Sequence, residues 1–181
     1  MSLFEIESEH FGGEVKVIKP TIFQDERGSL TVTFLQDEFK TLGLPNFVRY
    51  MYTRSEYSVL RGLHFQTEPA MGKLIQVIKG EAFLVAVDLR YDSPTFLGYH
   101  GIFVSEDNPL QVWASSGFAR GYCALSEETL VQYSCDEYKG DDSAIRWNDP
   151  DIGIDWPVDN PKLSVRDAQA PTAAEFFGGK Q

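Results

Sequence analysis

Short apolar runs, rather than long amphipathic segments, dominate this sequence. Each run has four to eight residues and is rich in Val, Ile, Phe and Tyr, as β-strands are. Clusters of Gly, Pro, Asn, Asp and Ser separate the runs, a spacing typical of sandwiches and barrels. The sequence therefore predicts an all-β fold. The expected strands cover residues 15–18, 29–34, 47–52, 74–78, 82–89, 101–104, 110–113, 120–125 and 129–134.

Only short helices are expected, at the periphery of the sheets. Residues 36–42 begin with acidic side chains, and Gly43 follows at the position where a helix ends in a left-handed residue. After Trp147, Pro-containing pairs interrupt any regular element. We expect one domain over residues 1–181, because domains usually have about 100–200 residues. Residues 170–181 are expected to form a loose tail.

The charge balance disfavours two classes of partner. The chain carries 16 Lys and Arg against 27 Asp and Glu, a net charge of −11, and such a field repels nucleic-acid phosphates. No apolar stretch reaches the roughly 18 residues that span a bilayer, and the first residues are acidic where a signal peptide is basic. We expect a cytoplasmic protein that binds neither nucleic acid nor membrane. Cys123 and Cys135, outside any CxxC motif, are expected to be buried thiols.

Among the three histidines, His64 is the candidate for chemistry. His10 lies in a polar stretch and His100 precedes a turn glycine, so both are expected at the surface. His64 lies within an apolar, strand-like run. A metal centre would need further ligands to converge there, but no other histidine falls in a strand expected to line a cavity. We therefore expect a site without a metal.

The strand-like run around His64 covers residues 59–66. Strict alternation places Arg61, Leu63 and Phe65 on one face and the even-numbered residues on the other. If the even face lines the inside of a barrel, His64 points into its cavity. Otherwise His64 is a core histidine that bonds a backbone carbonyl.

A buried histidine without a metal acts best as a general base, with a tyrosine as the acid and a carboxylate to orient the imidazole. Cations would then stabilise an oxyanion or bind a phosphate. Sequence spacing leaves the choice of partners open. The candidates are Tyr133 and Tyr138 as acids, Asp88, Asp136 and Asp167 as carboxylates, and Lys73 and Arg61 as cations.

Seven blocks of sequence, in one order along the chain, point to a known family. They are Phe-Gln-Asp-Glu-Arg-Gly at 23–28, Val-Leu-Arg-Gly-Leu-His-Phe-Gln at 59–66, Gly-Lys-Leu at 72–74, Val-Ala-Val-Asp-Leu-Arg at 85–90 with Ser-Pro-Thr-Phe at 93–96, Gly-Phe-Ala at 117–119, Trp-Asn-Asp-Pro at 147–150 with Ile-Gly-Ile-Asp-Trp-Pro at 152–157, and Leu-Ser-Val-Arg-Asp at 163–167. Together they resemble the dTDP-4-dehydrorhamnose 3,5-epimerases over nearly the whole chain. The resemblance implies a cupin-type jelly-roll homodimer that acts on a nucleotide-linked 4-keto-6-deoxyhexose without metal or cofactor.

The resemblance also implies catalytic roles for four residues. His64 matches the base of the family and Asp167 its carboxylate partner. Lys73 matches the lysine that stabilises the enolate, and Tyr133 the tyrosine that returns a proton from the opposite face. These roles suit the chemistry, because a 4-keto group acidifies the protons on C3 and C5 and the resulting enolate needs a cation or donor at its oxygen.

Substrate-binding residues follow from the same resemblance. Arg61 matches an arginine that holds the sugar nucleotide. Phe23 and Arg27 match residues that the family contributes across the dimer interface to the neighbour's nucleotide.

Departures from the family pattern lie around the expected substrate contacts. Residues 49–51 are Arg-Tyr-Met where the family has Gln-x-Asn, and Arg120 replaces a histidine. An arginine can bind a diphosphate bidentately but does not shuttle protons near neutral pH. The second tyrosine of the family falls on Tyr138 or Lys139, and this choice stays open. The further expected substrate contacts are Arg49, Met51, Arg120, Tyr138 and Arg166.

The leading hypothesis is an epimerase that inverts C3 and C5 of a dTDP-4-dehydro-6-deoxyhexose. A variant inverts one centre, or moves the keto group between carbons 3 and 4, with the same base. A catalytically silent cupin that binds a nucleotide sugar and a metal-dependent cupin oxygenase are the remaining hypotheses. His64, Asp167, Lys73 and Tyr133 occur together, which favours an enzyme, because a pure binder has little need of a base and an acid on opposite faces.

Overall fold

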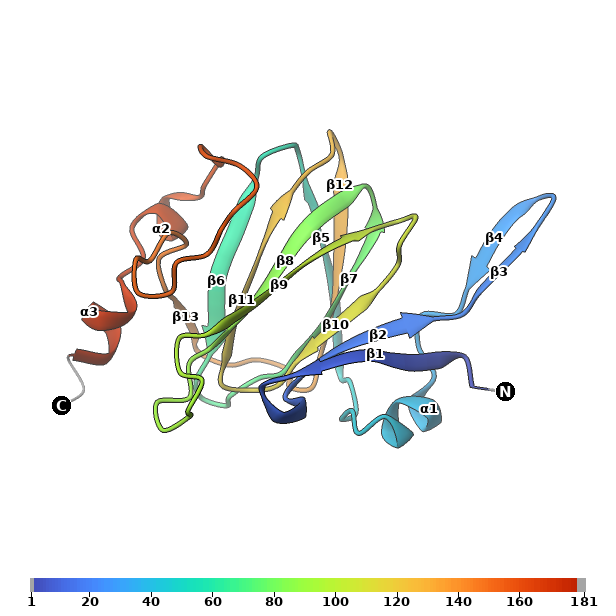
Figure 1. Cartoon of the computed structure of the whole chain (residues 1–181), viewed down its shortest axis with the longest axis horizontal. Helices are drawn as coiled ribbons and strands as arrows, with labels where there is room; N and C mark the ends of the chain where they lie inside the picture. The colour runs from blue at the N-terminus through green and yellow to red at the C-terminus, as the bar shows by residue number, and fades with distance from the viewer. Residues whose placement is uncertain (1, 179–181) are drawn as a thin grey trace.

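Two antiparallel sheets packed face to face make up most of the computed structural model, which describes residues 2–178 (Figure 1). The strand order is β1-β2-β10-β7-β12-β5 in the first sheet and β13-β6-β11-β8-β9 in the second. The prediction of an all-β, cupin-type jelly roll is confirmed. The first sheet contains β1 (Phe4–His10), β2 (Val15–Pro20), β5 (Arg49–Ser55), β7 (Lys73–Lys79), β10 (Gln111–Ala114) and β12 (Thr129–Cys135). The second contains β6 (Leu60–Gln66), β8 (Glu81–Asp88), β9 (Tyr99–Ser105), β11 (Phe118–Ala124) and β13 (Asp142–Ala144).

Each predicted strand overlaps a strand of the structure, with shifts at the ends. The run at 29–34 shows the largest difference, because its strand β4 covers Gly28–Thr31 and pairs only with β3 (Ile22–Asp25). Sequence patterning missed three strands: β1, in which charged and apolar residues alternate along an edge strand, the four-residue β3 and the three-residue β13. Such short or half-polar edge strands carry a weak apolar signal.

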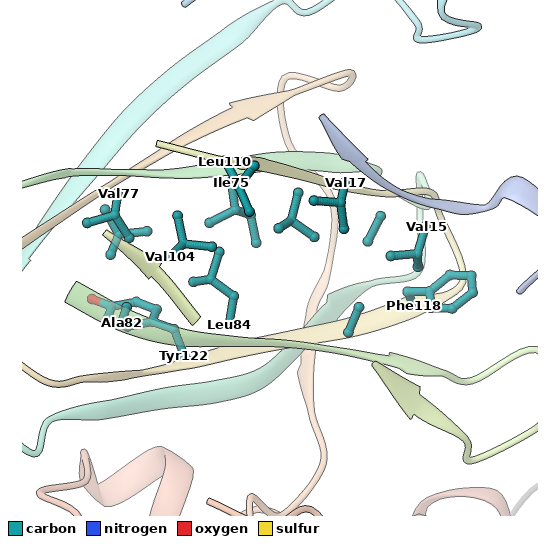
Figure 2. Packing of buried hydrophobic residues seen from close by; sticks show 14 of the residues in the cluster. Val15, Val17, Ile75, Val77, Ala82, Leu84, Val104, Leu110, Phe118 and Tyr122 are labelled. Atoms are coloured by element: carbon teal, nitrogen blue, oxygen red, sulfur yellow. The ribbon is translucent and has the colours of Figure 1, made fainter. Parts of the chain in front are cut away.

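One apolar cluster fills much of the space between the sheets (Figure 2). Val17 and Val112 of the first sheet meet Leu84 and Phe118 of the second there. Two further clusters cover the outer faces of the sheets. The central strands β8 and β11 are therefore buried on both faces, which explains why their sequences are nearly continuous apolar runs.

The helices are short and lie outside the sheets, as predicted. They are η1 (Phe11–Gly13), α1 (Gln36–Thr41), α2 (Val165–Ala168) and α3 (Ala173–Gly178). Gly43 follows α1 with a φ of 76°, the expected left-handed conformation. Phe39 of α1 is buried in the cluster on the outer face of the first sheet. Within residues 2–178 no helix is long and apolar enough to cross a membrane.

The C-terminal segment corrects one prediction. Residues 173–178 form α3 where a loose tail was expected. Phe176 packs edge-on against Phe65 of β6, with 5.2 Å between ring centroids, and the backbone N–H of Ala173 donates to Asp149 Oδ2 at 2.6 Å. This segment thus covers the outer face of the second sheet. Residues 179–181 of the predicted tail lie outside the described residues.

The β3–β4 hairpin extends away from the body of the molecule (Figure 1). Phe23 is 47% exposed and Leu30 62% exposed, although both are large apolar residues. An apolar hairpin without intramolecular cover is a typical element of an interface.

Candidate active site

A cavity of about 160 Å³ lies between the two sheets. The first sheet lines it with residues of β5, β7 and β12, and the second with residues of β6 and β11. The cavity brings together six of the predicted site residues: Met51, Arg61, His64, Lys73, Arg120 and Tyr133. Thr53, Ile75, Gly121 and Tyr122 complete the lining.

A bulge in β6 directs both Arg61 and His64 into this cavity. Strict alternation predicted opposite faces for them, and that prediction is wrong. On β11, Arg120 pairs with His64 and Tyr122 with Arg61, so β6 has one residue more than β11 over the same stretch. Gly62 lies at this irregularity with a φ of 148°, and a Cβ there would lie 2.6 Å from the Cα of Gly121. Glycine is therefore required at this position.

His64 is oriented by Asp167. The imidazole Nε2 lies 2.6 Å from Asp167 Oδ1, although 103 residues separate them in sequence. The short helix α2 positions this carboxylate, since Ser164 Oγ caps the helix by accepting a hydrogen bond from the Asp167 backbone N–H at 3.1 Å. An Nε2–H that donates to Asp167 leaves Nδ1 as the proton acceptor of the imidazole.

Burial alone would raise the pKa of Asp167. Hydrogen bonds and the charge of His64 outweigh burial, so that the pKa lies below its usual value and the carboxylate stays ionised. The other two candidate carboxylates have different partners. Asp88 accepts hydrogen bonds from Arg90, Ser93 and Thr95, and Asp136 accepts one from the backbone N–H of Gly72.

Three cations line the cavity, and within residues 2–178 none has a carboxylate at ion-pair distance. Lys73 is 7% exposed, and burial, with the charge of nearby Arg120, lowers its pKa to about 8. Arg61 is partly exposed, and its Nε donates to Ser55 Oγ at 3.1 Å. In a chain of net charge −11, unpaired cations gathered in one cavity indicate an anionic ligand.

Tyr133 lies on the wall of the cavity formed by the first sheet, whereas His64 comes from the second sheet. Burial, with Tyr122 nearby, raises the pKa of the Tyr133 hydroxyl, so it is protonated at neutral pH. The cavity thus has a proton acceptor on one wall and a proton donor on the other.

The sequence model of the dTDP-4-dehydrorhamnose 3,5-epimerases matches residues 13–175. This chain belongs to that family. The epimerase of Methanothermobacter thermautotrophicus is 46% identical over 157 residues, which cover 83% of this chain and 85% of that protein. The epimerase of Neisseria gonorrhoeae is 42% identical over 166 residues, and this chain spans about half of its length (90% of this chain, 51% of that protein).

A solved structure from the epimerase family is also similar. The structure of dTDP-6-deoxy-D-glucose-3,5-epimerase from Legionella pneumophila, in complex with dTDP-4-keto-L-rhamnose, matches with a TM-score of 0.89 at 38% identity. The match covers 94% of this chain and 93% of that chain. The family is thus supported by sequence and by structure.

Besides Asp167, which contacts His64, five predicted residues lie outside the cavity of this family member. Tyr138 is 72% exposed, and its backbone carbonyl accepts a hydrogen bond from Arg49 Nη1 at 3.1 Å. Arg166 lines a second cavity, to which His64 and Asp167 also contribute, and its Nη1 atom lies 3.7 Å from Asp142 Oδ2. Phe23 and Arg27 are on the exposed β3–β4 hairpin, where Arg27 Nε donates to Asp25 Oδ2 at 3.0 Å.

Sequence reasoning missed a set of hydroxyl groups beside the cavity of the epimerase fold. The Tyr122 hydroxyl lies 2.9 Å from Thr53 Oγ1 and 2.7 Å from Ser55 Oγ. The period-2 alternation of β5, applied to Met51, would have placed Thr53 and Ser55 on the same face.

The remaining histidines, His10 and His100, stack on each other with 3.6 Å between ring centroids, away from the cavity lining. Within residues 2–178 no group of three or more His, Cys, Asp or Glu side chains is arranged to hold a metal ion.

Proposed function

We propose that this chain epimerises a dTDP-4-dehydro-6-deoxyhexose at C3 and C5. The observation that carries the proposal is the pairing of an oriented imidazole and a protonated tyrosine on opposite walls of one cationic cavity. Inversion of a carbon centre requires a base on one face and an acid on the other.

The chemistry begins at the Nδ1 atom of His64, which takes the proton from C3 or C5. The electron pair of that C–H bond moves into a C–C double bond, and the C4 carbonyl becomes an enolate oxygen. Protonated Lys73 stabilises this charge. The Tyr133 O–H then donates its proton to the same carbon from the opposite face. Exchange with solvent removes the proton from His64 and returns one to Tyr133, which resets the site for the second centre.

The size of the cavity limits which part of the substrate can enter it. About 160 Å³ is far below the roughly 300–1,000 Å³ of pockets that enclose a drug-sized ligand, so only the sugar ring enters. The diphosphate then lies beside Arg61, the partly exposed cation of the lining. Arg49, Tyr138 and Arg166 lie outside the lining, where they are available to the diphosphate and the nucleoside.

A homodimer completes the nucleotide site in this proposal. The exposed β3–β4 hairpin carries Phe23 and Arg27, and a second subunit would cover its apolar residues. Strand β5 is an edge of the first sheet and exposes Tyr50 and Tyr52. Pairing of such edges between two subunits is a common way to cover them. Light scattering is expected to give a dimer, and a particle of 20.4 kDa would contradict this part of the proposal.

The decisive test is incubation with dTDP-4-keto-6-deoxyglucose in deuterated water, followed by mass spectrometry of the sugar nucleotide. We expect two stably incorporated deuterium atoms, one at each inverted centre. One deuterium would replace the proposal with a single-centre epimerase. No deuterium, with retained affinity for dTDP, would identify a silent nucleotide-binding protein.

A further inference from the structure

Arg120 is the most deeply buried cation of the cavity. It is 4% exposed, and its Nη1 and Nη2 atoms donate to a single acceptor, the carbonyl oxygen of Met71, at 2.9 and 2.6 Å. A guanidinium has five N–H donors, so these two bonds leave the Nε–H and one hydrogen on each terminal nitrogen. The Nε atom is buried without a hydrogen-bond partner among the described residues.

An unpartnered buried donor on a charged group is costly, and such groups normally have a partner. Arg120 lines the cavity, and within residues 2–178 it has no carboxylate at ion-pair distance. The partner that its remaining donors lack is therefore an acceptor on the ligand that fills the cavity.

The position of Arg120 indicates which part of the ligand this side chain contacts. It lies directly opposite His64 in the β11–β6 register, and it lines the same cavity as Lys73 and Tyr133. Its charge is also close enough to contribute to the lowered pKa of Lys73. Arg61, by contrast, is partly exposed, and its guanidinium is held by Ser55 Oγ and the carbonyl of Arg54. Arg120 is thus at the reacting end of the substrate and Arg61 nearer the diphosphate.

We propose that Arg120 contacts the C4 oxygen of the bound keto-sugar together with Lys73 and stabilises the enolate as a second cation. This assignment rests on the proposed epimerase function and differs from the diphosphate contact that the sequence suggested for Arg120. No proton leaves the guanidinium, because its role is to donate hydrogen bonds that strengthen as negative charge develops on the oxygen.

Burial lowers the pKa of Arg120 to about 10, so the guanidinium stays charged at neutral pH. Its own charge therefore does not depend on the protonation state of Lys73. Two adjacent cations with no carboxylate at ion-pair distance among residues 2–178 are costly in the absence of substrate, which favours a role in the reaction rather than in folding.

The test compares Arg120→Gln and Arg120→Lys with the matched control Arg61→Gln. For each protein, kcat and KM are measured by solvent deuterium incorporation, and the dissociation constant of dTDP by calorimetry. Arg120→Gln is expected to lower kcat by about 10²-fold, the usual effect of removing one oxyanion donor, and to leave dTDP affinity nearly unchanged. Arg120→Lys restores the charge and is expected to recover most of that loss. Arg61→Gln is expected to weaken dTDP binding and raise KM with a smaller effect on kcat.

Two results would overturn the assignment. In the first, Arg120→Gln keeps the wild-type kcat, and its dTDP affinity falls by the same factor as its kcat/KM. This result would make Arg120 a diphosphate contact. In the second, deuterium incorporation by Arg120→Gln equals that of the wild type. Absence of incorporation by the wild type would instead refute the proposed function, and the assignment with it. If Arg120→Gln does not fold, as judged by circular dichroism, Arg120→Met removes the same donors without adding an unpaired amide and decides between the same results.

Discussion

The space between the two sheets has two halves, which differ in the side chains that point into them. In one half, valine, leucine and phenylalanine side chains fill the space. In the other half, the inward positions carry cations, an imidazole and a tyrosine around a cavity. Strand β11 contributes to both halves, since Phe118 belongs to the packed cluster and Arg120, two residues further, lines the cavity. Strand β7 does the same with Val77 and Lys73.

Residues that stabilise the fold and residues that serve the chemistry thus lie on the same strands, at different positions along them. The period of two keeps both kinds of side chain on one face, and only the residue type changes. The packed half supplies apolar burial that offsets the cost of desolvating unpaired cations in the other half. Substitutions in the two halves should therefore affect different measurements.

The largest expected effect is on turnover, at the base. His64→Asn removes the proton acceptor and is expected to lower kcat by about 10³-fold, within the range for general base catalysis. dTDP affinity should change little, because the imidazole contacts the sugar ring. Deuterium incorporation and calorimetry check the two quantities. Wild-type turnover in this variant would refute the assignment of His64 as the base.

The packed half should respond in the opposite way. Phe118→Ala removes a fully buried ring from the central cluster and is expected to lower the free energy of unfolding by about 3–5 kcal/mol. The kcat of the molecules that remain folded should stay within about twofold of the wild type, since Phe118 does not line the cavity. Urea unfolding and deuterium incorporation test this pair of expectations. A large loss of kcat in the folded protein would show that the halves are coupled.

The fall of activity at alkaline pH should reflect the loss of the proton from Lys73. Its pKa of about 8 results from burial and the charges of Arg120 and Arg49, which Cys135 and Asp142 partly oppose. Because the enolate requires protonated Lys73, kcat/KM is expected to fall about tenfold per pH unit above pH 8. The free energy of unfolding should change in the opposite direction. Between pH 8 and the usual value of 10.5 the unfolded chain binds the additional proton, so this contribution to stability increases with pH.

Lys73→Met is the control for both pH trends and gives the smallest expected change in stability. It replaces a buried, unpaired cation by an apolar side chain of similar length and is expected to stabilise the fold by about 1 kcal/mol at pH 7. Turnover should be lost, and the increase in stability between pH 8 and 10.5 should be reduced. A destabilised variant would mean that Lys73 has a structural role that its contacts do not reveal.

The strands of this fold could be predicted because their apolar runs are short and bounded by turn residues, and His64 could be selected because it lies within such a run. The partner of His64 could not be derived from local pattern, since Asp167 lies 103 residues away on a short capped helix. The family resemblance identified it, whereas periodicity left three carboxylates open.

Three features were decided only by tertiary structure. The bulge at Gly62 directs Arg61 to the same side as His64, because an added residue reverses strict alternation and depends on close approach to Gly121. The helix at residues 173–178 forms where an outer sheet face offers apolar contacts to Phe176. Arg120 lies near Lys73 because β11 and β7, which belong to opposite sheets, both line the cavity. The sequence by itself determined most of the strands, the likeness to the family and the residue types of the site, because these follow from local periodicity and motif. Which side chains meet was decided by packing, since contacts between distant segments exist only once the two sheets have closed on each other.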